Sequence, residues 1–413
     1  MASMDKGSVT SNTIFRVILF TFLGGFIFVM ASGIRNNYGI MLDSIIVNSG
    51  VPFTTVSFIL AVGQFVFGAV QPAFGILASK KGNVYALVSG VVLTVTGLLL
   101  LPLCRSTVSL MIVLGFILPA GTGALGFGII MGAVSPNIPA KAYTSVAGII
   151  IAGHGLGNVI MSPAINSLIE TGGLMHSMLI LSLAAALMLP IAIIMGRKPK
   201  IDSDVNSTAN EIQSQKTEQI STAELLKKAM KSRTYLYLAV GFFTCGFHMS
   251  LLINHLPAQF LSYGFSSQDA ANAFSMYGFA AIIGAVTTGF VCIRMKMKNV
   301  LGIIYGLRPV TIIIFLFMPV NIYTITAFTT LLGVSGAATV TPVSGLVKKS
   351  FGTVHLATLY GFVFCIHQVG GFFGAWFGGI CYDLTGSYTI IWLVTAALGA
   401  IAAAASFVIK EPD

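Results

Sequence analysis

Long apolar segments alternate with short polar turns along the whole chain. A helix of roughly 20 apolar residues crosses the hydrocarbon layer of a membrane. Segments of that length recur twelve times, six in each half of the sequence. The first six lie near 14–42, 52–78, 84–104, 108–133, 143–168 and 175–196, and the second six near 234–262, 270–293, 299–320, 322–347, 356–382 and 387–409. The pattern predicts an all-α membrane protein with twelve transmembrane helices.

One long polar segment interrupts this pattern between the sixth and seventh predicted helices. It divides the chain into a six-helix bundle over residues 1–196, a linker over 197–233 and a second six-helix bundle over 234–413. Within the linker, Ser221 and Glu224 have the spacing of a capping box and precede an apolar run. We expect a short amphipathic helix there, on the inner membrane face, although a flexible tether without further function fits the same composition.

The Lys and Arg residues are unevenly distributed around the predicted helices. If the N-terminus is cytoplasmic, 19 of the 22 fall in cytoplasmic segments. The other three are Arg105, which falls outside, and Arg35 and Arg308, which fall within helices. This positive-inside distribution predicts a multi-pass plasma-membrane protein with both termini in the cytoplasm. It also explains the net charge of +10 without a nucleic-acid partner.

The composition agrees with a membrane environment and disfavours an enzyme. Hydrophobic residues make up 56% of the chain and charged residues 8%, against about 25% charged in soluble domains. The five cysteines fall in or beside apolar runs, where they resemble packing residues rather than a disulfide or metal framework. We find no metalloprotease motif, no phosphate-binding loop and no pair of carboxylates inside the apolar runs. We therefore expect no catalytic residues, no metal and no cofactor.

The two halves of the sequence resemble each other. A shift of 213 residues superimposes His154 on His367 and Gly157 on Gly370. A shift of 214 superimposes Gly50 on Gly264. A duplicated six-helix bundle is the basis of many transporters, in which the binding site lies at the midplane between the repeats. Because both histidines lie in Gly-rich segments, we interpret them as packing residues.

Three segments make the chain resemble the major facilitator superfamily. Gly75 to Gly82 (GILASKKG) is similar to the family's loop between its second and third helices, with Ser79 in place of the usual Asp. His367 to Gly379 and Gly33 to Gly39 resemble a bacterial branch related to monocarboxylate and oxalate/formate porters. The resemblance covers nearly the whole chain. It implies two pseudo-symmetric six-helix bundles, a functional monomer surrounded by lipid, and a bacterial inner membrane location.

Arg35 and Arg308 are the main candidates for substrate binding. No Asp or Glu lies inside an apolar run to neutralise them, and an unpaired charge at membrane depth is costly. A guanidinium is suited to gripping a carboxylate through two hydrogen bonds. Arg308 is followed by Pro309 in the ninth helix, and Arg35 stands beside Asn36 and Tyr38. The alternatives are that Arg308 bonds to backbone carbonyls of a neighbouring helix, and that Arg35 extends outward to the membrane interface.

The seventh predicted helix carries the densest set of polar residues. His248, His255 and Gln259 share one helical face, and Asn254 is adjacent. Histidine titrates near neutral pH, so His248 or His255 is a candidate for coupling a proton to transport. The alternative is a neutral histidine in a helix contact. Asn254, His255, Gln259 and, in the ninth helix, Tyr305 complete the predicted substrate-binding set, with Gln64 as a weaker candidate.

These residues predict a secondary active transporter of a small, monocarboxylate-like organic anion. It would work by alternating access, either as a proton-coupled symporter or as an anion exchanger. The main alternative is an importer or exporter of a larger amphipathic compound, and a minor one is a transporter-like membrane receptor. The partners implied are a small-molecule anion, protons and membrane lipid.

Overall fold

The computed structural model describes residues 11–139, 142–197, 222–352 and 356–412, and its long segments there are helical. Eleven of these helical stretches are long and apolar enough to cross a membrane. One of them, Ser145–Gly196, has 52 residues and contains a sharp change of direction at Gly173, whose φ is 69°. It therefore represents the fifth and sixth predicted spans together. The prediction of an all-α protein with twelve spans is confirmed.

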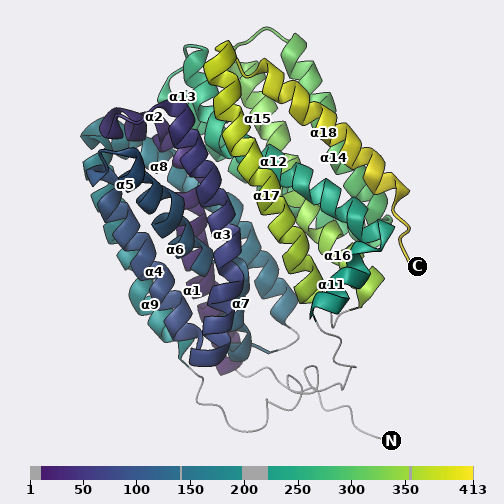
Figure 1. The fold of residues 1–413 in the computed structure, drawn as a ribbon. Coiled ribbons are helices and arrows are strands. Elements are labelled where there is room, and N and C mark those ends of the chain that lie inside the picture. The colour runs from purple at the N-terminus through teal and green to yellow at the C-terminus, as the bar shows by residue number, and fades with distance from the viewer. Residues whose placement is uncertain (1–10, 140–141, 198–221, 353–355, 413) are drawn as a thin grey trace, which may run out of the picture.

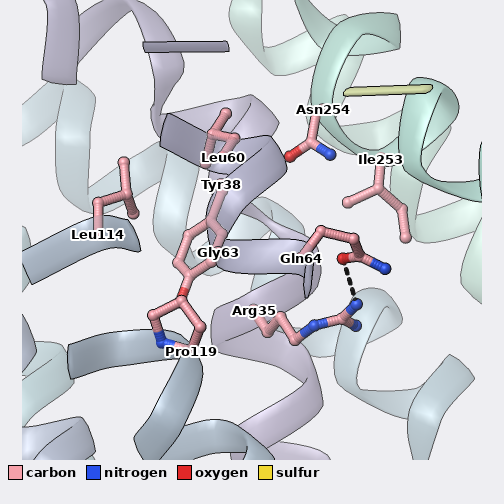
Figure 2. A pocket seen from close by; sticks show the side chains of 9 residues that line it. All are labelled: Arg35, Tyr38, Leu60, Gly63, Gln64, Leu114, Pro119, Ile253 and Asn254. Atoms are coloured by element: carbon pink, nitrogen blue, oxygen red, sulfur yellow. Dashed lines mark hydrogen bonds between the residues drawn. The ribbon is translucent and has the colours of Figure 1, made fainter. Parts of the chain in front are cut away.

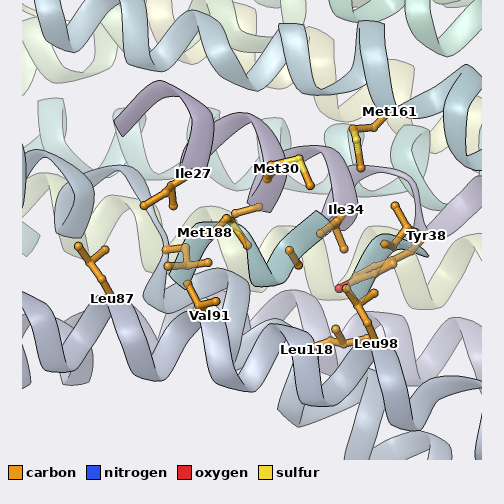
Figure 3. Close-up of a cluster of buried hydrophobic side chains, with 14 of the residues drawn as sticks. Ile27, Met30, Ile34, Tyr38, Leu87, Val91, Leu98, Leu118, Met161 and Met188 are labelled. Carbon is orange, nitrogen blue, oxygen red and sulfur yellow. The ribbon is translucent and has the colours of Figure 1, made fainter. Parts of the chain in front are cut away.

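The first half of the chain forms one bundle of helices (Figure 1). Its elements are α1 (Ser11–Asn36), α2 (Tyr38–Ser49), α3 (Phe53–Lys81), α4 (Asn83–Leu100), α5 (Thr107–Leu110), α6 (Leu118–Ala124), α7 (Phe127–Val134), α8 (Tyr143–Ala186) and α9 (Met188–Gly196). The fourth predicted span is not one regular helix, because a π-helical segment over Met111–Ile117 joins α5 to α6. The buried side chains of this half form a continuous apolar cluster, part of which appears in Figure 3.

The second half forms a second bundle beside the first (Figure 1). Its elements are α11 (Thr222–Met230), α12 (Arg233–Ser262), α13 (Ser267–Arg294), α14 (Met297–Phe317), α15 (Ile322–Gly336), α16 (Val340–Phe351), α17 (Leu356–Thr385) and α18 (Thr389–Val408). The predicted linker helix corresponds to α11, which buries Leu225 and Ala229 and exposes Lys227 and Lys228. Its expected cap, Ser221, lies outside the described residues.

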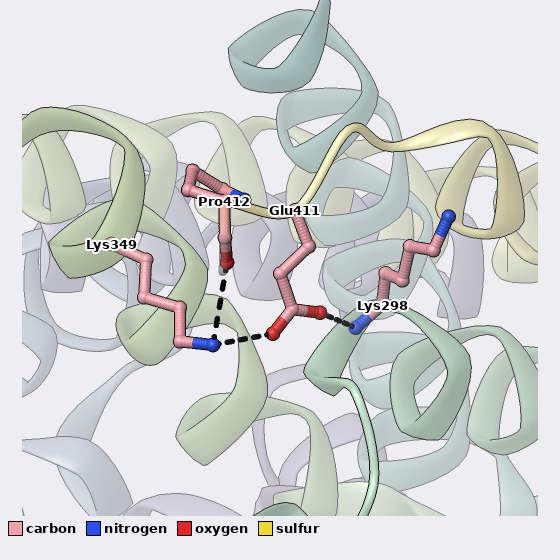
Figure 4. A network of polar contacts seen from close by, with 4 residues as sticks. All are labelled: Lys298, Lys349, Glu411 and Pro412. Atoms are coloured by element: carbon pink, nitrogen blue, oxygen red, sulfur yellow. Dashed lines mark hydrogen bonds and ion pairs between the residues drawn. The ribbon is translucent and has the colours of Figure 1, made fainter.

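We call the end of the molecule where α1 begins and α18 ends the terminal end, and the opposite end the distal end. At the terminal end the C-terminal tail folds back onto two helices (Figure 4). The Glu411 carboxylate accepts a hydrogen bond of 3.0 Å from the backbone N–H of Lys298, in the first turn of α14. Its other oxygen forms an ion pair of 2.9 Å with Lys349 of α16. The tail therefore joins the beginning of α14 to the end of α16.

The two bundles touch along two seams that start at the distal end. In the first seam, Phe53 of α3 packs against His255 of α12 and Tyr382 of α17. This seam continues towards the middle of α3, where Gly68 lies against Gln368 of α17. In the second seam, Glu170 of α8 accepts a hydrogen bond of 2.7 Å from Ser267 of α13.

The second seam extends along α8 and α13 to two glycines. Gly155 and Gly278 bring α8 and α13 so close that an added Cβ on either residue would lie 2.5 Å from the other's carbonyl oxygen. Ser275 of α13 also donates a hydrogen bond to the Val159 carbonyl of α8. These contacts close the interface from the distal end to about its midpoint.

Candidate functional site

The first predicted helix is broken at the residues that the sequence singles out. α1 ends at Asn36 and α2 begins at Tyr38, with Asn37 as the connecting residue. The Asn37 side chain donates to the Gly33 carbonyl and accepts from Ser162 of α8, at 2.6 and 2.7 Å. These bonds stabilise the break, which is the kind of helix interruption that transporters place at a binding site.

A small pocket lies beside this break, between the two bundles (Figure 2). Its lining comes from α1, α2, α3, the fourth span and α12, and consists of Arg35, Tyr38, Leu60, Gly63, Gln64, Leu114, Pro119, Ile253 and Asn254. Its volume of about 20 Å³ is enough for roughly one water molecule. The close approach of α2 to α12 requires Gly39, because a Cβ there would collide with the Ile253 carbonyl.

Arg35 is the only charged residue that lines this pocket. Its guanidinium donates to the side-chain oxygens of Gln64, at 2.6 Å, and of Asn36, at 3.1 Å. It also lies over the Phe67 ring, 3.9 Å from the centroid. Amides and an aromatic face stabilise a cation, but they leave its charge unneutralised. The pocket therefore carries a positive charge that no described side chain in contact with Arg35 neutralises.

The hydrogen-bond network around Arg35 extends into the second bundle through Gln64. Gln64 of α3 donates a hydrogen bond of 2.8 Å to the Gln368 side-chain oxygen on α17, which is also 3.3 Å from Nδ1 of His367. On the other side, the Asn36 amide is 3.1 Å from Nε2 of His154 on α8. The two histidines related by the sequence repeat thus stand at the two ends of one polar network that passes through Arg35.

Several buried polar atoms around this network lack a hydrogen-bond partner. They are the Tyr38 hydroxyl, the side-chain nitrogen of Gln368, Nδ1 of His154 and both polar side-chain atoms of Asn158. A buried donor without a partner costs about 1–3 kcal/mol, so natural proteins rarely keep one without a ligand or a water molecule. Of these, the Tyr38 hydroxyl lines the same pocket as Arg35, and a hydroxyl donor is chemically suited to a carboxylate oxygen.

Two of the predicted residues on α12 point away from the pocket. Nε2 of His255 is bonded to the Ala375 carbonyl of α17 at 2.6 Å, and its ring contacts Phe53 and Tyr388. Gln259 accepts a hydrogen bond from the Trp392 indole and donates one to Tyr263, each 2.9 Å long. Asn254 lines the pocket, although its amide donates to Ser250 one turn earlier.

Arg308, Tyr305 and His248 lie together inside the second bundle and outside the pocket. Arg308 is 1% exposed, and its guanidinium donates to the carbonyl and hydroxyl oxygens of Ser335 on α15 at 2.7 and 3.2 Å. It is also 3.5 Å from the Cys245 sulfur and stands over the Tyr305 ring. His248 is 1% exposed and packs edge-on against Trp392. Arg308 therefore has the helix-to-helix contacts that were the alternative to a substrate role, while its Nη1, the Tyr305 hydroxyl and Nε2 of His248 lack a hydrogen-bond partner.

Four residues of this network lie outside the predicted substrate-binding set, namely Gln64, which was a weaker candidate, and Gln368, His154 and His367. Glutamine carries no charge, so its presence in an apolar run does not stand out as an arginine does. The repeat was the available signal, since it paired His154 with His367. No group of three or more metal-ligating side chains occurs in the part of the chain that the structure describes.

Comparison with known proteins agrees with this architecture. The Major Facilitator Superfamily model matches residues 21–291 and 238–413. Monocarboxylate transporter 12 of Xenopus laevis is 28% identical over 339 residues, covering 75% of this chain and 70% of that protein. The human monocarboxylate transporter 12 is 27% identical, covering 74% of this chain and 63% of that protein. The uncharacterized MFS-type transporter YcxA of Bacillus subtilis is 28% identical over 39% of this chain and 40% of its own length.

A solved structure matches the whole chain. The crystal structure of a D-xylose-proton symporter superimposes with a TM-score of 0.73 and covers 97% of this chain and 98% of its own. The identity is 11%, so this likeness concerns the fold alone. The family match and the relatives indicate a multi-pass transporter of small molecules rather than an enzyme. The chain belongs to the major facilitator superfamily and resembles its monocarboxylate porters.

Proposed function

We propose that this protein is a secondary active transporter of a small monocarboxylate, working by alternating access. The observation that carries the proposal is the unneutralised Arg35 guanidinium, which lines a pocket between the bundles and whose partners are uncharged. Charge-assisted hydrogen bonds between guanidinium and carboxylate are about twice as strong as neutral ones. A bound carboxylate would therefore outcompete the amide oxygen of Gln64.

Binding requires Gln64 to release Arg35, because the pocket as it stands has room for roughly one water molecule. The released Gln64 would also lose its alignment with Gln368 on the opposite bundle. Substrate would in this way replace a contact between the bundles with a contact to itself. Alternating access requires substrate binding to change the contact between the bundles in this way. A ligand shifts the equilibrium between two conformations of a protein only if it binds them with different affinities.

The names of the relatives support a carboxylate, since two of those described above are called monocarboxylate transporter 12. The alternative substrate, a larger amphipathic compound, would need a wide apolar cavity in place of a pocket with one cation. We further propose a functional monomer in the plasma membrane, of the bacterial inner membrane type. The terminal end would face the cytoplasm, following the distribution of Lys and Arg. The structure would then be closed towards the outside.

The test is thermal unfolding of the purified protein with acetate, pyruvate and lactate, each compared with its uncharged amide. A ligand that binds the folded state raises its stability by RT ln(1 + [L]/Kd). We expect at least one carboxylate, and none of the amides, to stabilise the protein. Arg35→Gln should weaken binding by roughly 30-fold or more, which corresponds to the 2–5 kcal/mol lost when a buried charge loses its partner. Arg35→Lys should also bind more weakly, because it lacks the planar fork.

Arg308→Gln and Arg105→Gln are the matched controls. Arg105 is exposed at the distal end and donates to the Asn48 carbonyl, so its loss should leave affinity unchanged. Arg308→Gln should lower the unfolding temperature while the folded fraction keeps its affinity. Loss of affinity in Arg308→Gln with normal affinity in Arg35→Gln would move the substrate site to Arg308. Normal affinity in both would remove the support for an anion, and the amphipathic alternative would be favoured.

A further inference from the structure

We propose that His367 is the residue that binds the proton coupled to anion transport. The inference rests on the proposed function, and it differs from the expectation that a histidine of α12 has this role. His367 lies on α17 and is half-buried. The next residue, Gln368, accepts a hydrogen bond from Gln64 of α3, and we call this pair the bridge between the bundles. His367 is thus both reachable by a proton and in contact with the substrate network.

The two histidines on α12 lack that combination. His248 and His255 are each 1% exposed. The His255 ring is fixed by the Ala375 carbonyl, and the backbones of α12 and α17 are in direct contact around Gly246 and Gly374. A proton could reach these rings only if the second bundle itself opened. Interiors of this kind are close-packed and resist such opening.

The hydrogen bonds of the bridge have a direction that the charge on His367 would set. The Gln368 oxygen accepts from Gln64 at 2.8 Å and is 3.3 Å from Nδ1 of His367. A protonated imidazole has N–H donors at both nitrogens, so Nδ1 must then donate to that oxygen. This turns the Gln368 amide nitrogen away from the ring and keeps it as a free donor, consistent with its lack of a partner.

Loss of the proton allows the opposite arrangement. In the tautomer with its proton on Nε2, Nδ1 becomes an acceptor, and the Gln368 amide can rotate to donate to it. The carbonyl oxygen would then take the place of the free donor, facing the anion's oxygens and repelling them. Gln64 would at the same time lose its acceptor on α17. Protonation of His367 therefore forces the bridge to present a donor to the substrate, whereas the neutral ring permits an acceptor there.

The charges around His367 favour joint binding of proton and anion. On α12 the ring lies beside Cys245, which is 3.5 Å from Arg308 of α14 and 3.3 Å from the Thr339 hydroxyl. On its own helix, Phe364 stacks against it and Tyr360 lies one turn further, and Phe242 of α12 covers another face. Across the interface, Gln64 joins the bridge to Arg35.

No carboxylate is among these neighbours. An anion bound at Arg35 would bring a negative charge into the hydrogen-bonded network that includes His367. By linkage, the anion must then raise proton affinity as much as the proton raises anion affinity. One proton and one monocarboxylate together also cross the membrane without net charge.

The experiment measures proton uptake and anion affinity together in purified protein. Addition of the anion that stabilises the wild type, in weakly buffered solution with a pH dye, should consume about one proton per site. Wild-type affinity should fall by up to about tenfold per pH unit as the pH rises through the range in which the bound proton is released. His367→Gln should bind the anion with little dependence on pH and take up no proton.

His248→Gln and His255→Gln are the controls, and each should keep proton uptake. His367→Asn is a second variant in case His367→Gln does not fold, since its amide nitrogen lies nearer to the position of Nδ1. Proton uptake that persists in a folded His367 variant, or that disappears in an α12 variant instead, would overturn the assignment. Failure of the proposed function has a different signature, because no carboxylate would then bind wild-type protein at any pH.

Discussion

The contact between Gly155 of α8 and Gly278 of α13 gives the sharpest test of the conformational argument. A Cβ at Gly155 would lie 2.5 Å from the Gly278 carbonyl oxygen, whereas real Cβ contacts stay above 3.0 Å. The same holds for a Cβ at Gly278 against the Gly155 carbonyl. Either Gly→Ala change therefore forces the helices apart by at least about 0.5 Å, and the obstacle is backbone, which cannot turn aside.

The free-energy cost of this clash falls on the state in which the distal half of the interface is closed, as it is in this structure. Overpacking of this kind typically costs about 1–3 kcal/mol. If the state open at the distal end separates α8 from α13, it escapes that cost. The equilibrium between the two states should then shift towards the distal-open state by roughly 5- to 150-fold. We expect Gly155→Ala and Gly278→Ala to show this shift separately.

A cysteine at Ser57 provides the assay. Ser57 of α3 is fully buried in this state, and a Cβ at Gly379 of α17 would lie 2.6 Å from its hydroxyl. The Ser57→Cys thiol should react with a membrane-impermeant reagent only when the distal end opens. Gly155→Ala should speed that reaction by a factor within the range given above. The parent protein, with its native cysteines, provides the background rate.

Gly148 of α8 and Gly289 of α13 are the matched controls. An added Cβ at either position meets no atom within 4 Å, so Gly148→Ala and Gly289→Ala share the change in helix propensity without the clash. They should leave the rate at Ser57→Cys unchanged. If Gly155→Ala and Gly278→Ala react no faster than these controls, then separation of α8 from α13 does not open the distal end, and the reasoning fails.

Two further predictions concern the ends of the molecule. Burial raises the pKa of Glu411, but the Lys298 backbone N–H and the Lys349 ammonium outweigh it and hold the pKa below its usual 4.5. The stabilising effect of the ionised Glu411 carboxylate should therefore be fully present above about pH 4.5 and should disappear as the pH falls through the lower pKa of the folded state. Glu411→Gln should accordingly lower the unfolding temperature at pH 7 but not at a pH below that pKa. The proposed orientation, with the terminal end in the cytoplasm, is tested by labelling intact cells with a membrane-impermeant thiol reagent. Asp383→Cys at the distal end should react and Lys231→Cys at the terminal end should not. The reverse pattern would mean that the distal end faces the cytoplasm.

The number of spans was predictable because hydropathy records lipid contact directly, whereas the breaks within spans depend on local geometry. The first predicted span, 14–42, is interrupted at Asn37, whose side chain is bonded to Gly33 and Ser162. Ser162 is distant in sequence, so no local pattern indicated it. The fifth and sixth predicted spans meet at Gly173, whose backbone is non-helical (φ 69°, ψ −173°), so the two helices that the sequence suggested are both present.

The residues that line the pocket were harder to predict, because a residue type does not reveal the face of the helix on which it lies. Arg35 and Arg308 looked equivalent in the sequence, yet Arg308 is surrounded by α12, α14 and α15 of one bundle, while Arg35 reaches the interface. The rotation of a helix about its axis decides this difference. That rotation follows from close contacts such as Gly39 with the Ile253 carbonyl, which only the folded chain displays.

The internal repeat explains why a single cation is left at the interface. The shift of 214 residues that superimposes Gly50 on Gly264 also places Arg35 on Met249. Met249 is half-buried, and its sulfur is 3.6 Å from the Tyr277 hydroxyl, so the second half carries a neutral side chain where the first carries a guanidinium. The histidines, by contrast, are present in both halves. Two arginines facing each other across the interface would require two negative charges, whereas one arginine requires one. The replacement of arginine by Met249 in the second half therefore favours a monocarboxylate over a dicarboxylate. Any second positive charge at the interface would be a proton, which can dissociate during transport.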